Sequence, residues 1–181
     1  METIFEKLNQ CDHHIEYFKG KSGAYALKII KADVNSEQSR IKLTLLTEEN
    51  KSVICNIYLI KKDGTESIKY GTWIIKDLVY NLKIDQITLE AKNDGFSIPE
   101  FKDKVVGIFL EKKVILGFEN PQKTYYSIET SYDVDTKRTA KESIHNIEAT
   151  EIAQLQQKHR GIPSIPSVKS SKNENIHPGG F

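Results

Sequence analysis

The chain is poor in the residues that define small secreted proteins and membrane proteins. It has 181 residues but only two cysteines, Cys11 and Cys55, which are too few for a disulfide framework. It contains no run of about 18 apolar residues, so we expect no transmembrane helix. Its first residues carry acidic groups where a signal peptide has basic and apolar regions. These absences favour a cytoplasmic protein without a membrane partner.

The chain also has no large excess of positive or negative charge. The 26 basic and 25 acidic residues give a net charge of +1. Counterion release depends on local clusters of lysine and arginine, so binding to a nucleic acid requires only that the basic groups be segregated. With 38% hydrophobic residues, the chain can support one domain of ordinary size and an appendage.

Motifs for catalysis and metal binding are incomplete. Gly20-Lys21-Ser22 matches the end of a phosphate-binding loop, but Ile15 stands where that loop needs a glycine. The segment Cys11–His14 has no second cluster that would complete a tetrahedral metal site. No Gly-x-Ser-x-Gly elbow is present, and the paired carboxylates have no complementary histidine or lysine constellation. The sequence therefore predicts no catalytic residue, no metal site and no cofactor, and a metal-dependent nuclease is the least favoured class.

The chain does contain a clear succession of strand and helix patterns. Three runs with strand periodicity are followed by one apolar helical run and then by two further strand-like runs. The strands are expected at Ala24–Val34, Arg40–Thr47, Ser52–Ile60, Val105–Leu116 and Thr124–Val134, and the helix at Tyr70–Leu82. This order is that of an OB fold, so we predict a mostly β protein with a five-stranded OB-like barrel and an inter-strand helix.

Two of these elements carry predictions about burial. The third strand is apolar on both faces, with Val53 and Ile57 on one and Ile54 and Tyr58 on the other, which predicts a central strand. Trp73 follows the helical periodicity of the apolar run. We therefore expect its ring to plug the core rather than to stack on a ligand.

Flanking segments extend this domain on both sides. The predicted boundaries are 1–22 for an N-terminal helical flank, 23–138 for the OB-fold domain, 139–160 for a C-terminal helix and 161–181 for a disordered tail. Thr139 and Glu142 form a capping box that opens the C-terminal helix. Its apolar stripe, which packs on the barrel or on a second copy of the chain, is Ile144, Ile147, Ile152 and Leu155. Residues 84–104 are expected to form an insertion.

Binding to an unpaired nucleic acid is the function that the side chains favour most. It needs exposed aromatic faces beside a basic track, without strict spacing along the sequence. The candidates for stacking on bases are Tyr25, Tyr58, Phe118, Tyr125 and Tyr126. The candidates for holding phosphates are Lys28, Arg40, Lys42, Lys112, Lys113 and Lys123. If the barrel gathers them into one cleft, affinity for a single strand should fall as salt rises.

Several pieces of the chain resemble the single-stranded DNA-binding proteins of tailed bacteriophages, a divergent OB-fold group. The similar pieces, within residues 22–145, are Gly23–Ile29, Ser39–Leu45, Thr72-Trp73-Ile74 with Leu78 and Leu82, Phe101–Gly107 and Ser131–Glu142. The resemblance implies coating of single-stranded DNA during phage replication or recombination, without a cofactor. Many single-strand binders recruit replication partners through an acidic tail with a final aromatic residue. Phe181 matches that last residue, but residues 175–180 carry no carboxylate.

A second reading of the sequence is a protein-interaction adaptor. Here the barrel is only a scaffold, and the capped C-terminal helix presents its apolar stripe to a partner. The exposure of Ile144, Ile147 and Leu155 separates the two readings. An exposed stripe favours an adaptor or an oligomer, and a continuous basic groove lined by aromatic rings favours DNA binding.

Overall fold

A computed structural model describes residues 16–60, 71–115 and 123–160 of the chain. Phe118, the side chain of Lys123, residues 1–15 of the N-terminal flank and the predicted tail lie outside the described residues. The strands are β1 (Gly23–Asn35), β2 (Arg40–Leu46), β3 (Ser52–Tyr58), β4 (Glu90–Lys92), β5 (Gly95–Ser97), β6 (Val105–Ile115) and β7 (Lys123–Tyr132). The helices are α2 (Trp73–Asn81), the 3-10 turn η2 (Pro99–Phe101), α3 (Ala140–Ile144) and α4 (Glu151–His159). The prediction of a mostly β fold is confirmed.

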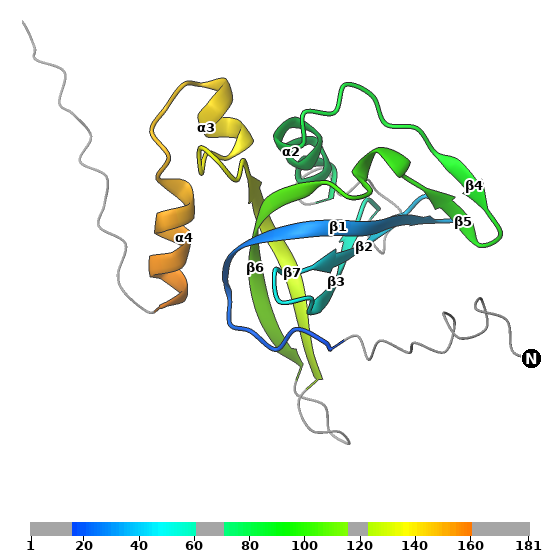
Figure 1. Ribbon diagram of the computed structural model, residues 1–181, viewed down its shortest axis with the longest axis horizontal. Coiled ribbons are helices and arrows are strands. Elements are labelled where there is room, and N and C mark those ends of the chain that lie inside the picture. The colour runs from blue at the N-terminus through cyan, green and yellow to red at the C-terminus, as the bar shows by residue number, and fades with distance from the viewer. Residues whose placement is uncertain (1–15, 61–70, 116–122, 161–181) are drawn as a thin grey trace, which may run out of the picture.

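The long strand β1 organises an antiparallel sheet. It pairs with β2, β5 and β6, while β2 pairs with β3, β5 with β4, and β6 with β7. The register shifts between Ile29 and Lys31, and the buried side chains change there from Leu27 and Ile29 to Ala32 and Val34. Such a bulge bends a strand. The bend lets the first half of β1 pair with β6 and its last residues with β5, as Figure 1 shows.

Among the described residues the sheet is not closed. β3 pairs only with β2 and β7 only with β6, although β3 and β7 are neighbours in space. The prediction that β3 is a central strand is therefore wrong. Val53 and Ile57 are buried, but Ile54 and Tyr58 on the opposite face are exposed because no further layer covers them there.

The described part of the N-terminal flank, residues 16–22, contains no helix. Tyr17 forms a parallel bridge with Ser52, and the Phe18 N–H donates to the Ser52 carbonyl oxygen at 2.9 Å. An edge strand has unpaired backbone groups that attract such a segment. The flank thus covers the beginning of the β3 edge and leaves the rest of that edge beside β7.

Helix α2 confirms the predicted inter-strand helix and lies at one end of the strands (Figure 1). Leu78 is fully buried in the core, and Asn81 Nδ2 donates to Ser131 Oγ at 2.9 Å. Trp73, however, is 59% exposed. The prediction that its ring plugs the core is wrong, because the inward face of the helix is the one that carries Leu78.

Residues 84–104 form an addition to the end of β1. It contains the short hairpin β4–β5, whose turn is Asn93-Asp94. Gly95 follows with a φ of +138°, and a Cβ there would collide with the Val34 carbonyl oxygen. A glycine is required at this position because it must approach β1 in a conformation that other residues rarely adopt.

Two short helices stand where one C-terminal helix was predicted. The capping box of Thr139 and Glu142 is confirmed at the start of α3. The chain then turns at Asn146, which has a φ of 49°. The second oxygen of Glu142 accepts from the N–H groups of Thr150 and Glu151, at 2.7 and 2.8 Å. One buried carboxylate thus caps the N-termini of both helices.

The break divides the predicted apolar stripe. Ile152 and Leu155 of α4 pack against Phe109 of β6, whereas Ile144 and Ile147 are exposed. Helix α4 therefore stands alongside β1 and β6, as Figure 1 shows. None of the helices in the described ranges is long and apolar enough to cross a bilayer.

Candidate nucleic-acid interface

A groove of about 400 Å³ lies where the sheet is open. We call it the β3–β7 groove, and its lining residues are Ile54, Asn56, Ile57 and Tyr58 of the β3 region, Gly71 and Ile74 near the start of α2, and Tyr125 to Ile128 of β7. Three segments far apart in the sequence build it. No local motif could therefore have revealed it.

Two of the predicted stacking residues, Tyr58 and Tyr125, line this groove together. Tyr58 is 57% exposed and Tyr125 is 43% exposed. Asn56, on the same face of β3 as Tyr58, adds an amide that can donate and accept hydrogen bonds. Sequence reasoning overlooked Asn56, although its spacing of two residues from Tyr58 was a usable signal.

Tyr126 lines the same groove with a buried ring. It is 9% exposed and belongs to the hydrophobic core. Its hydroxyl donates to the Gly20 carbonyl oxygen at 2.8 Å, and its ring centroid lies 5.2 Å from that of Phe18. Tyr126 therefore anchors the segment before β1, and its ring does not offer an open face for stacking.

Gly71 fixes one wall of the groove. A Cβ at this position would collide with the Tyr58 carbonyl oxygen, so only glycine lets the two backbones approach this closely. The contact sets the start of α2 against the end of β3, next to the Tyr58 ring. The sequence contained a glycine before an apolar helix, but it gave no indication of what that glycine touches.

Arg40 and Lys42 flank the groove on β2. The register places Arg40 opposite Tyr58 and Lys42 opposite Asn56. Residues directly opposite in an antiparallel pair lie on the same face of the sheet. Both cations are exposed, and neither forms an ion pair with a carboxylate of the described residues. They are therefore available to an anion on this face.

Lys28 and Lys113, two further predicted cations, are already paired. Lys28 Nζ lies 2.9 Å from Asp103 Oδ1, and Lys113 Nζ lies 3.1 Å from Glu111 Oε2. The hydrogen bond from Lys28 lowers the pKa of Asp103, so this carboxylate stays ionised beside its partner. A phosphate would have to compete with both carboxylates, which makes these lysines weaker candidates than Arg40 and Lys42.

Tyr25 and Lys112 lie on the β1 side of β6 and do not line the β3–β7 groove. Tyr25 is half-buried, which raises its pKa, and its hydroxyl donates to the Lys21 carbonyl oxygen at 2.7 Å. Its ring meets that of Phe18 edge-on at 5.0 Å. The N–H of Lys112 donates to Ser22 Oγ at 2.9 Å. The single cleft expected for all the candidates is therefore divided.

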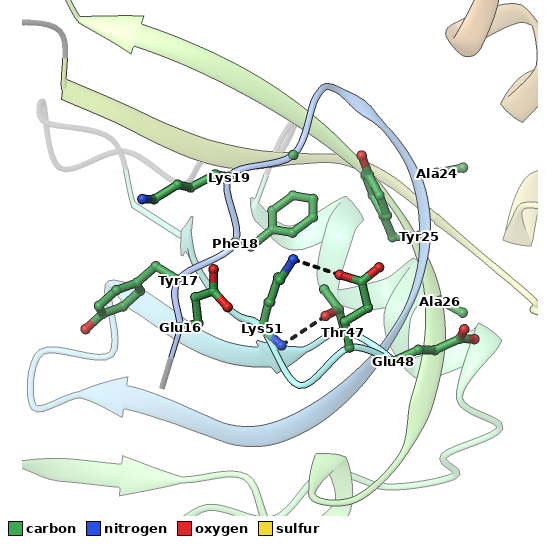
Figure 2. Close-up of a pocket in the computed structure, with 12 residues that line it drawn as sticks. Glu16, Tyr17, Phe18, Lys19, Ala24, Tyr25, Ala26, Thr47, Glu48 and Lys51 are labelled. Carbon is green, nitrogen blue, oxygen red and sulfur yellow. Dashed lines mark hydrogen bonds and ion pairs between the residues drawn. The ribbon is translucent and has the colours of Figure 1, made fainter. Parts of the chain in front are cut away.

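Figure 2 shows a further depression between Tyr25 and the segment 16–20. Phe18 and Tyr25 supply aromatic rings to it. Its charged residues are Glu16, Glu48, Glu49, Lys19 and Lys51. Lys51 Nζ lies 2.8 Å from Glu49 Oε2, so one ammonium group is already neutralised. The excess of carboxylates makes this depression unfavourable for phosphate.

The reactivity of Cys55 and the grouping of metal-ligating side chains can be judged in the described residues. Cys55 is fully buried, which raises the pKa of its thiol to about 12. A thiol with such a pKa supplies almost no thiolate near neutral pH. No group of three histidine, cysteine, aspartate or glutamate side chains within the described ranges is placed to hold a metal ion.

The interface thus consists of two exposed tyrosines and an amide in an open groove, with two cations on the adjoining strand. This combination can stack on flat aromatic groups and attract anions. No family model and no curated protein matches the chain.

Proposed function

We propose that this chain binds single-stranded DNA with little sequence preference, and that it acts in phage DNA replication or recombination in the cytoplasm of the host. The observation that supports the proposal most is that Tyr58 and Tyr125 share one open groove. Arg40 and Lys42 on the same outer face supply the positive charge that phosphates need. The resemblance to phage single-strand binders supports DNA as the ligand and replication or recombination proteins as further partners.

In this proposal β1, β2, β3, β6 and β7 are the five strands of an OB-like barrel that is open between β3 and β7. Their order along the chain, with α2 between β3 and β6, is the order that an OB fold requires. The β4–β5 hairpin is then an insertion at one end of β1. The opening matters for function because a closed pairing of β3 with β7 would leave no space for bases between them.

Base stacking and counterion release would both contribute to the binding free energy. Every base has a π-face, and stacking on an aromatic side chain contributes about 1–3 kcal/mol per base without reading its identity. Each phosphate neutralised on a single strand contributes about −0.7 to the slope of log affinity against log salt. Arg40 and Lys42 together would therefore give a slope of about −1.4 from this groove alone.

An equilibrium titration of fluorescently labelled oligothymidine with the full chain tests the proposal. We expect binding at low salt, affinity that falls as salt rises, and weaker binding to a duplex of the same length, whose bases cannot unstack onto the tyrosines. Circular dichroism of the same sample shows that the protein is folded. A folded protein that fails to bind oligothymidine at low salt would refute the proposal.

A protein-interaction adaptor is the second candidate, and one observation favours it. Ile144 and Ile147 of the C-terminal region are exposed, as is Trp73 on the neighbouring helix α2. Apolar side chains of this size on a surface are typical of contacts with another protein or a second copy of the chain. Light scattering of the wild type and of Ile144→Ser/Ile147→Ser tests self-association, which the double substitution should abolish.

A further inference from the structure

A second groove, on the opposite side of β6 from β7, is lined by cations. It lies between the start of β1, strand β6 and the C-terminal end of α4, and its volume is about 610 Å³. We call it the α4 groove. Its charged or ionisable side chains are Lys21, Lys112, His159 and Arg160, and the Tyr25 ring lines it as well. No described carboxylate lines this groove.

The lysine and arginine side chains of the α4 groove have no carboxylate partner among the described residues. Seven lysines elsewhere in the described residues lie within 4.0 Å of a carboxylate oxygen. Lys21, Lys112 and Arg160 have no such partner in the described ranges, and all three are exposed. Three cations from three different segments therefore line one groove, and none of them lies within 4.0 Å of a carboxylate oxygen of the described residues.

The helix dipole explains only part of this arrangement. Basic residues near a helix C-terminus interact favourably with the partial negative charge there. The dipole accounts for Lys158 and Arg160 at the end of α4, and Lys158 Nζ also lies 4.0 Å from a carboxylate oxygen of Glu129. The dipole does not account for Lys21 or Lys112, which come from the segment before β1 and from β6.

Packing of α4 holds this convergence in place. The His159 ring lies 5.2 Å from that of Phe109 on β6, and Ile152 is buried at the other end of the helix against the same cluster. The end of the helix is therefore fixed against the sheet. As a result Arg160, the residue directly after α4, lines the same groove as Lys112.

We propose that the α4 groove binds phosphates of the same single strand that stacks in the β3–β7 groove. The inference rests on the proposed function. The two grooves flank the β6–β7 hairpin, in which Lys112 pairs with Tyr126 and Lys113 with Tyr125. The width of two neighbouring strands, about 10 Å, separates them. A strand of several nucleotides can therefore cross the hairpin, and the Tyr25 ring lines the groove that it enters.

Oligothymidines of two lengths distinguish the two grooves. Sites on OB folds cover about 4–16 nucleotides, so an oligonucleotide of about 4 nucleotides can fill one groove and one of about 16 can reach both. We would titrate the wild type, Lys112→Gln/Arg160→Gln, and the control Lys31→Gln/Lys83→Gln, which removes the same charge from lysines that are paired with Asp33 and Asp133 and line neither groove. The substituted side chains are exposed, and thermal melts should confirm that all three proteins fold.

The α4-groove variant should bind the long oligonucleotide about 10-fold more weakly, with a salt slope reduced by about 1.4, as two lost phosphate contacts predict. It should bind the short oligonucleotide as the wild type does, and the control should change neither slope. An unchanged affinity and slope on the long oligonucleotide would overturn the inference and leave the proposed function intact. A wild type that binds neither length would refute the proposed function itself.

Discussion

The two grooves on either side of the β6–β7 hairpin differ in the chemistry that they offer. The β3–β7 groove has two exposed tyrosines within it and cations only on its border, at Arg40 and Lys42. The α4 groove has several basic side chains within it and one half-buried ring, Tyr25. From this difference we expect bases to bind in the β3–β7 groove and phosphates to bind in the α4 groove.

The alternation of side chains along the hairpin decides which of them are exposed. Neighbouring residues on a strand point to opposite faces, so Tyr125 and Tyr126 differ in exposure although both line the β3–β7 groove. Tyr125 is exposed and Tyr126 belongs to the core. The same alternation separates Lys112, which lines the α4 groove, from Lys113, which pairs with Glu111.

The largest effect should come from removing the rings of the β3–β7 groove. Tyr58→Ala/Tyr125→Ala should weaken binding of a short oligothymidine about 100-fold, because each stacked base contributes about 1–3 kcal/mol. Fluorescence anisotropy measures the change. Tyr80→Ala, which removes an exposed tyrosine from α2, is the matched control and should bind as the wild type does. Equal losses in both variants would mean that the groove has no special role.

Weakening the N-terminal cap of α4 should reduce binding in the α4 groove and leave binding in the β3–β7 groove unchanged. Glu142 caps α4 through the N–H groups of Thr150 and Glu151, and Glu142→Gln should lower the free energy of unfolding by about 2 kcal/mol, since hydrogen bonds to a charged acceptor are lost. Denaturant unfolding measures this loss. Affinity for the long oligonucleotide should fall, while affinity for the short one should not. A parallel loss of short-oligonucleotide binding would show that the two grooves are not independent.

The charge at the border of the β3–β7 groove should have a moderate effect. Arg40→Gln/Lys42→Gln should reduce the salt slope by about 1.4 and weaken binding about 10-fold, because both cations lack carboxylate partners among the described residues. Lys28→Gln/Lys113→Gln makes the same charge change at paired lysines and should leave the slope nearly unchanged. The distinction between paired and free cations fails if both variants behave alike.

A final effect, on stability rather than on binding, depends on pH and concerns Asp77 of α2, which lies near Glu151 of α4. Burial and the nearby Glu151 carboxylate raise the pKa of Asp77 to about 6. A raised pKa means that the folded state binds the proton more tightly, so this group opposes folding above pH 6 and ceases to do so as pH falls towards 4. Asp77→Asn should therefore melt at a higher temperature than the wild type at pH 7.5. The difference should shrink steadily between pH 6 and pH 4 and be nearly gone at pH 3, and a difference of undiminished size at pH 3 would contradict this assignment.

The sequence was sufficient to predict the elements that depend on local patterns. The five main strands, the inter-strand helix and the Thr139–Glu142 capping box follow from periodicity and capping chemistry, which act over a few residues. The break between α3 and α4 was harder to predict. It depends on Asn146 in a left-handed conformation and on a carboxylate that reaches eight residues along the chain.

The two grooves could not be predicted, because their formation required information that a single sequence does not contain. The exposure of Tyr58 depends on β3 lying at an open edge of the sheet, and the periodicity of β3 is equally compatible with burial on both faces. Arg160 joins Lys112 only because α4 docks against β6. Trp73 is a case in which the sequence predicted burial wrongly. Its apolar character indicated a buried ring, but the orientation of α2 exposes it.

Photo-cross-linking of an oligothymidine that carries 5-iodouracil tests most directly whether bases occupy the β3–β7 groove. Peptide mapping by mass spectrometry then identifies the residues that contact the bases. We expect cross-links at Tyr58 or Tyr125, and their loss at each position when that tyrosine is replaced by alanine. Efficient cross-linking confined to other residues, with none at either tyrosine, would contradict the binding of bases in this groove.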